Sequence, residues 1–240
     1  MSLPKIKIPF FDSEIPSNGT KIKYRPFLMK EEKILLIASS GNSTKEIISS
    51  LYQVINNCIV QSNGKPINID KLTTFDLEFL FLKIRSKSVD NVVNLKYHDA
   101  EDGETRSFTI NLDDVKLVTN QNNNHNIKVN DEVSLIMAYP TAKMMMDLSN
   151  ESISESDMND IMLRSSIKEI YTSDTSYLAQ ESTKEELDEF IDSLPSHVFK
   201  DIQKFFDTMP KLYYKIEYTN NKGTARIIEL SSLEDFFTLG

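Results

Sequence analysis

The chain has 240 residues, of which 40% are hydrophobic and 26% charged, as in ordinary globular proteins, and it is long enough for one large domain or two small ones. No apolar run approaches the roughly 20 residues that a membrane-spanning helix needs, the first residues (MSLPKIKIPF) do not read as a secretory signal, and the single cysteine excludes an intrachain disulfide. The net charge of −9 argues against nucleic acid and anionic membranes as partners.

The N-terminal part predicts an extended arm over residues 1–19, followed by a strand and a helix. In the strand, Ile22 and Tyr24 share one face, and Pro26 ends it because proline cannot donate to a sheet ladder. The run KEEK then begins a helix, with its acidic residues at the positive helix end, and the following residues Ile34 to Ile37 are expected to be buried. We take Tyr24, Arg25 and Phe27 as candidate partner contacts, although burial in a core is the commoner fate of aromatic residues.

The following segments predict more helices and then an antiparallel β-meander. Helical spacing of apolar residues over 44–59 and from Thr73 to Ile84 indicates two helices. The pattern then changes to alternation, which is typical of strands, and the run DAEDGE indicates a hairpin turn. The expected strands of the meander are 92–97, 108–112, 115–118, 127–129 and 133–139.

The second half is predicted to be mostly helical. Apolar spacing suggests a long helix from Glu155 to Tyr171, with Ile167 and Ile170 facing inward, and then a stretch over 172–182 that is irregular or briefly extended. The run NNKG is a hairpin turn, and the chain then closes with a short helix. The other expected elements are helices over 183–194 and 196–209 and hairpin strands over 212–218 and 224–230.

Negative charge is concentrated in one band of this half. From Asp147 to Asp192 the sequence has 13 acidic and 3 basic residues, so the net negative charge of this band is larger than that of the whole chain. Such a band either attracts a basic protein surface or is simply a solvated helix face. The candidate contacts within it are Glu185, Glu186, Asp188 and Glu189.

Together these patterns predict an α+β fold. We expect an N-terminal α+β domain over residues 1–140, made of the arm, the helices and the meander. An acidic helical domain over 141–240, which ends in the β-hairpin and the short helix, is expected to complete the chain.

Residues that could carry chemistry are sparse. The three histidines, His98, His125 and His197, follow no metal-ligand spacing, and Cys58 lies on the apolar stripe of a predicted helix. Phosphate-binding loops, dinucleotide fingerprints and nucleophile elbows are absent from the sequence. We therefore predict no catalytic, cofactor-binding or metal-binding residue and no small-molecule substrate.

Three stretches carry a resemblance to a known family. The runs KYRPFLMKEEKILL, EELDEFIDSLPSHVFKDIQKFFDTMPKL and LEDFF, in this order, resemble a baseplate hub protein family of T-even-type contractile-tailed bacteriophages. The resemblance implies a non-enzymatic protein that acts by protein–protein contacts with other baseplate and tail hub proteins. It implies assembly in the host cytoplasm and leaves open whether the protein stays in the virion. The alternative is a small host-directed binding module or an enzyme with a degenerate site.

In some members of that family the C-terminal hairpin is associated with cysteine pairs. The corresponding turn here, from Tyr218 to Thr224, contains none, so turn chemistry alone is expected to hold it. Phe236 and Phe237 on the final helix either pack within the chain or dock on another subunit. We favour packing on the hairpin and on the helix that carries Phe205 and Phe206.

Overall fold

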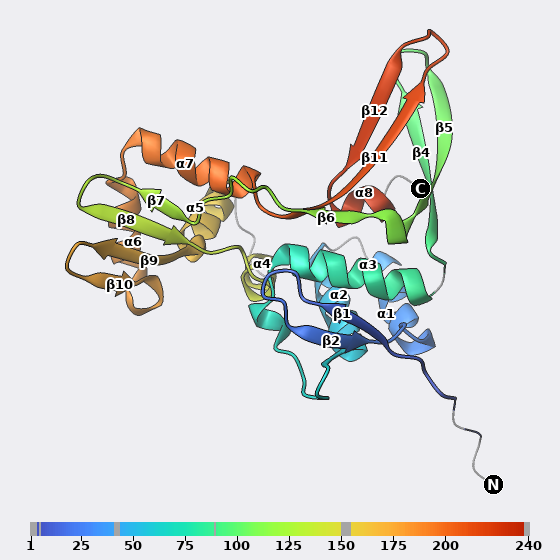
Figure 1. Ribbon diagram of the computed structural model, residues 1–240, viewed down its shortest axis with the longest axis horizontal. Helices are drawn as coiled ribbons and strands as arrows, with labels where there is room; N and C mark the ends of the chain where they lie inside the picture. Colours follow the sequence, from blue (N-terminus) through green and yellow to red (C-terminus); the bar gives the residue numbers. More distant parts are fainter. Residues whose placement is uncertain (1–3, 5, 41–43, 89, 150–154, 238–240) are drawn as a thin grey trace. The chain divides into compact units, whose positions relative to one another are not determined.

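The computed structural model describes residues 4, 6–40, 44–88, 90–149 and 155–237 and confirms an α+β fold (Figure 1). The helices are α1 (Met29–Ser40), α2 (Thr44–Cys58), α3 (Thr74–Ser88), α4 (Ala142–Ser149), α5 (Glu155–Ser166), α6 (Lys184–Asp192), α7 (Ser196–Asp207) and α8 (Leu233–Phe237). The strands are β1 (Phe11–Glu14), β2 (Lys21–Tyr24), β3 (Ile59–Gln61), β4 (Val92–Asp99), β5 (Glu104–Asn111), β6 (Lys116–Val118), β7 (Asn126–Lys128), β8 (Val133–Met137), β9 (Ile167–Thr172), β10 (Ser176–Leu178), β11 (Lys211–Thr219) and β12 (Ala225–Leu230).

The chain divides into a discontinuous unit and an inserted unit. The discontinuous unit joins Met1–Val118 to Lys211–Gly240, and the inserted unit is Thr119–Pro210. The chain leaves and re-enters the discontinuous unit at one place, because β6 pairs with β11 there, Leu117 opposite Leu212. This division differs from the predicted boundary at residue 140, since β8 and β9 pair across that point.

In the discontinuous unit, a small sheet of order β1-β2-β3 accompanies helices α1 to α3. Ile22 on the central strand β2 is fully buried, which agrees with the alternation seen in the sequence. α3 has buried residues on more than one face, among them Phe75, Leu80 and Ile84.

Two long hairpins complete this unit, β4 with β5 and β11 with β12, and they extend side by side (Figure 1). A hydrophobic core joins their bases to α3 and α8, and Phe236 is fully buried in it. The predicted packing of Phe236 on the hairpin is therefore observed. The buried members of this core are Leu82, Leu95, Ile110, Leu112, Val115, Leu212, Ile216, Leu230 and Phe236.

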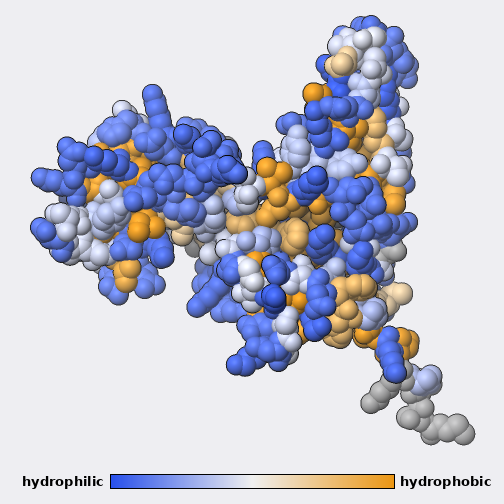
Figure 2. All heavy atoms as spheres, viewed as in Figure 1, coloured by the Kyte–Doolittle hydropathy of each residue, from blue (hydrophilic) through white to orange (hydrophobic). Residues whose placement is uncertain are grey.

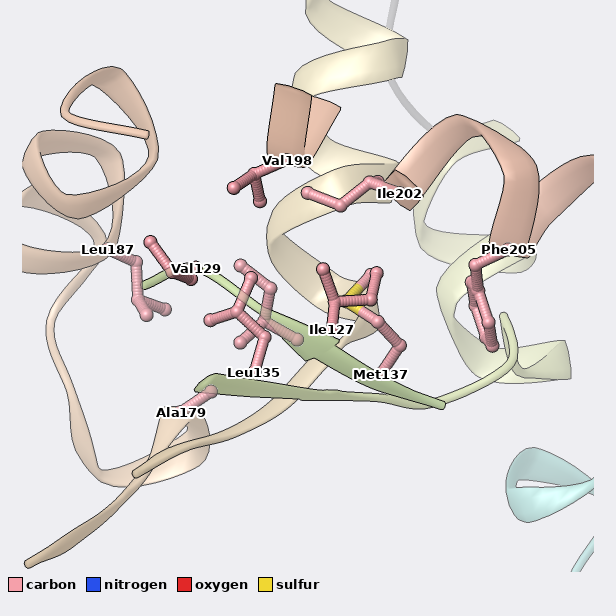
Figure 3. Close-up of a cluster of buried hydrophobic side chains, with 10 residues drawn as sticks. Ile127, Val129, Leu135, Met137, Ala179, Leu187, Val198, Ile202 and Phe205 are labelled. Carbon is pink, nitrogen blue, oxygen red and sulfur yellow. The ribbon is translucent and has the colours of Figure 1, made fainter. Parts of the chain in front are cut away.

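The inserted unit is a sheet of order β10-β9-β8-β7 with its own core. Figure 3 shows Val198 and Ile202 of α7 on the side of the strands that carries Ile127 and Leu135, and Phe205 belongs to the same core. Phe205 is a buried member of this core and Phe206 packs against it, and packing of the final helix on these two residues stays a prediction.

Two other predictions differ from the structure. The helix from Glu155 ends at Ser166, and the residues that follow form β9, because they pair with β8 on one side and β10 on the other. The expected meander is split among three sheets, since β6 pairs with β11 and β7-β8 joins β9. Long-range pairing decides both outcomes, which local periodicity does not reveal.

The burial of Phe236 leads to a stability prediction. Phe236→Ala should lower the free energy of unfolding by about 3–5 kcal/mol, because it leaves a cavity in a packed core. Phe199→Ala, at a side chain that is 58% exposed on α7, is the control and should change it by less than about 0.5 kcal/mol. Urea unfolding of the full chain measures both values, and equal effects would contradict this description of the core.

Candidate functional site

A buried ion pair fixes α1 to the end of β2. Arg25 Nη2 lies 2.9 Å from Glu31 Oε1, and the Glu31 side chain is fully buried. The same guanidinium donates to the carbonyl oxygens of Pro26 and Asn57, both at 2.9 Å, while the Leu28 backbone N–H donates to Glu31 Oε2 at 2.9 Å. The two charges therefore have hydrogen-bond partners on each side, as a buried pair requires.

The electrostatics agree with this geometry. Burial alone would raise the pKa of Glu31, but hydrogen bonds from Arg25 and from the Leu28 backbone outweigh it and lower the pKa to about 2. Nearby, burial raises the pKa of the Cys58 thiol to about 11, so the thiolate form is rare at neutral pH. Cys58 is thus a buried core residue whose thiol is mostly protonated at neutral pH.

The prediction that three N-terminal residues contact a partner is corrected by this arrangement. Tyr24, Arg25 and Phe27 are each less than a tenth exposed. Pro26 turns the chain at the end of β2, so that Arg25 reaches inward to Glu31 and the Phe27 backbone N–H donates to Ser88 Oγ at 2.9 Å. In this structure all three stabilise the discontinuous unit and none is open to a partner.

The outer side of α1 is instead the exposed apolar surface in this region. Met29, Leu36 and Ile37 are 66%, 59% and 73% exposed, and Figure 2 shows orange and pale orange atoms gathered around α1. Exposed Lys33 lies between them on the same helix side. The sequence contained the signal, because KILLIA is too apolar all round for a helix with one buried face.

A second polar cluster joins the tips of the two hairpins. Tyr218 on β11 donates to Asp99 Oδ2 at 2.6 Å, and this hydrogen bond is the main reason that the Asp99 pKa is below its usual range. Arg226 Nη2 lies 3.3 Å from the other Asp99 oxygen, and the Arg106 guanidinium stacks 5.2 Å from the Tyr218 ring centroid. The cluster holds the hairpins together and leaves Asp99 fully buried.

The turn without cysteines is held by hydrogen bonds to the DAEDGE turn of the other hairpin and not by its own turn chemistry alone. The Asn220 side chain accepts from the backbone N–H groups of Lys222 and Thr224 and donates to Glu101 Oε2 at 2.6 Å. The Asn221 backbone N–H donates to Asp102 Oδ2 at 2.9 Å, and Gly223 supplies the positive φ of 80° that the turn needs. The run DAEDGE therefore also holds the turn of the C-terminal hairpin. This contact between the two turns was not predicted from the sequence.

The four acidic candidates on α6 have different environments. Glu186 is half of a capping box with Thr183, and Asp188 pairs with Arg164 Nε at 2.6 Å, so both stabilise the inserted unit. Glu185 and Glu189 are exposed, four residues apart, on the same helix side. Reversing all four charges would therefore disturb folding, whereas Glu185 and Glu189 can be changed more safely.

The two terminal phenylalanines are not equivalent. Phe236 is a core residue, and the side chain of Phe237 lies outside the described residues. α8 is anchored through α3, where the half-buried Glu78 accepts a hydrogen bond from the Leu233 backbone. Burial, with a smaller contribution from Asp235, raises the pKa of Glu78 to about 7.

The described part of the chain contains neither a cluster of metal-ligating side chains nor a helix suited to span a membrane. Within residues 4, 6–40, 44–88, 90–149 and 155–237, no three His, Cys, Asp or Glu side chains gather as a metal ion would require. None of the helices in the described ranges is both long and apolar enough to cross a bilayer. His98 is on β4, His125 precedes β7 and His197 is on α7, so they come from different elements.

Comparison with known proteins gives the family. A family model described as T4 bacteriophage base plate protein matches residues 8–238. The chain belongs to this family. No curated protein and no solved structure matches it. The chain is thus a structural protein of a phage baseplate, a tail assembly in which it associates with other baseplate proteins.

The ion pair under α1 predicts an asymmetric mutational response. Arg25→Ala should lower the free energy of unfolding by about 3–5 kcal/mol, because it leaves the fully buried Glu31 with only the more distant, exposed Lys30 as counter-charge. Arg25→Met combined with Glu31→Leu should recover most of that loss, since the unpaired charge is then absent. Chemical denaturation of the three proteins measures this, and a double variant no better than Arg25→Ala would contradict it.

Glu78 predicts a pH dependence with a definite sign. Its pKa of about 7 in the folded chain is above the ordinary value of 4.5, so the folded state holds the proton more tightly. The resulting stability is fully present below pH 4.5 and is lost as pH rises through 7, by about 1–3 kcal/mol. Unfolding free energies at several pH values should show this fall.

Glu78→Gln should abolish that fall, because an amide does not titrate. The control is Glu14→Gln, at an exposed position on β1, which should keep the wild-type pH dependence. Glu31 does not confuse the result, since its lowered pKa affects stability only below about pH 4.5. An unchanged profile for Glu78→Gln would refute this assignment.

Proposed function

We propose that this baseplate protein builds the central hub of the baseplate by protein–protein contacts and without catalysis. The observation that carries the proposal is the family match, which spans residues 8–238. The more specific assignment to the hub rests in addition on the three runs that resemble a hub protein family and on their order along the chain.

The environment of the reactive side chains supports a non-enzymatic role. Cys58 is buried with a raised pKa, and Asp99 is occupied by Tyr218 and Arg226. Glu31 is occupied by Arg25. These groups stabilise the fold, and such use leaves them without the access to substrate that acid–base or nucleophilic catalysis needs.

The distribution of charge supports a protein partner. The inserted unit has 17 Asp and Glu against 7 Lys and Arg, while the rest of the chain has 19 against 20. Its exposed carboxylates, Glu185 and Glu189 among them, suit a basic protein surface. The same charge repels nucleic acid, so a role in contact with the genome is disfavoured.

Pairwise binding tests the hub assignment. The purified protein is mixed with each baseplate protein of its phage, and we expect retention by central hub proteins and not by peripheral ones. Retention by peripheral proteins only would refute the hub role while leaving the family intact. Mass spectrometry of mature virions then separates the two forms of the proposal, because a structural component is present there and an assembly factor is not.

The charge argument makes its own prediction. Glu185→Lys with Glu189→Lys should weaken binding to a basic hub partner by about tenfold or more at low salt, and the difference should shrink as salt rises. The control, Glu14→Lys with Glu104→Lys, changes the net charge equally at exposed positions of the discontinuous unit. Equal binding by both variants would show that Glu185 and Glu189 belong to a solvated helix face and do not contact the partner. Thermal melts check that both variants fold.

A further inference from the structure

The outer side of α1 is apolar along most of its length. With about 100° between successive helical residues, Met29, Lys33, Leu36 and Ile37 lie about 140–240° around the helix from Glu31. Glu31 itself is fully buried, so these four residues form a row on the opposite, solvent side, which we call the α1 ridge.

The helix cannot turn to hide this ridge. A roll that buried Leu36 and Ile37 would pull Glu31 away from Arg25 and from the Leu28 backbone N–H, each of which it contacts at 2.9 Å. Ala38, on the same side as Glu31, is also buried. The α1 ridge is therefore held outward by the same ion pair that fixes the helix.

The charges around the ridge favour one kind of partner. Lys33 lies within it, and Lys30 remains 68% exposed although it lies 3.3 Å from Glu31. The acidic neighbour Glu32 acts on Arg85 of α3, where its charge raises the Arg85 pKa against the stronger, lowering effect of burial. The exposed charge within the ridge itself is that of Lys33, and it complements carboxylates.

We propose that the α1 ridge is the docking site for an amphipathic helix of another baseplate protein, with carboxylates beside its apolar side chains. A ridge one helix wide, with apolar residues at positions i, i+7 and i+8, matches the way two helices pack along a seam. This inference rests on the proposed function, because it takes the partner from the baseplate.

Two other occupants fit less well. A second copy would set the lysine-bearing ridges of two identical helices against each other, which like charges oppose. The N-terminal arm of the chain has exposed Ile6 and Phe10, but it carries Lys7 and would add positive charge to the ridge. Both become outcomes of the test.

The experiment uses the full chain and each purified baseplate protein of the same phage as the probe. Leu36→Ser with Ile37→Ser should reduce binding to one of these proteins at least tenfold, and Lys33→Glu should reduce it more at low salt than at high salt. Phe199→Ser and Ile227→Ser, at side chains that are both 58% exposed elsewhere, are the controls and should bind as the wild type does. Thermal melts confirm that each variant folds. If Leu36→Ser with Ile37→Ser does not fold, Lys33→Glu alone tests the ridge.

The possible results are distinguishable. Loss with the ridge variants alone supports the proposal. Binding that persists in the ridge variants overturns it and leaves the proposed function standing. If light scattering shows that the wild type is a dimer and that the ridge variants are not, the ridge binds a second copy of the chain. If deletion of residues 1–10 is needed before a baseplate protein binds the ridge, the N-terminal arm occupies it. If no baseplate protein binds the wild type, the proposed function fails together with this inference.

Discussion

The ion pair between Arg25 and Glu31 is the constraint on which the N-terminal architecture depends. It joins the end of β2, the first turn of α1 and the carbonyl end of α2 through one guanidinium. Buried charges of this kind are costly when unpaired, so the three elements have one favourable arrangement. A consequence is that α1 keeps Leu36 and Ile37, from its apolar second half, in solvent.

The hairpin pair follows the same principle at the other end of the discontinuous unit. An apolar core that includes Phe236 joins the hairpin bases, and Asp99 with its donors Tyr218 and Arg226 joins the tips. The strands lie far apart in the sequence, so these contacts join the two chain segments of the discontinuous unit, and the acidic insertion lies between those segments in the sequence. The fold thus separates a near-neutral frame from an acidic inserted unit.

Local patterns in the sequence predicted much of the secondary structure, and long-range pairing explains the rest. The C-terminal hairpin was predictable because NNKG specifies its turn and apolar residues alternate on both sides. β9 was not, since Ile167 and Ile170 also fit a helix and only pairing with β8 and β10 decides between the two. Arg25 was predicted to be a partner contact, and its buried pairing with Glu31, six residues later, follows no sequence pattern that would have indicated it.

The most direct test of this account locates α1 in the assembled baseplate. Cys58 is buried, so Ile37→Cys gives the chain one readily accessible thiol, to which a short photo-crosslinker can be attached. Assembled baseplates should then yield a cross-link from position 37 to another baseplate protein, while the same label at position 227 yields none to that protein. Cross-links from position 227 and none from position 37 would contradict the claim that the Arg25–Glu31 pair holds α1 outward for a partner.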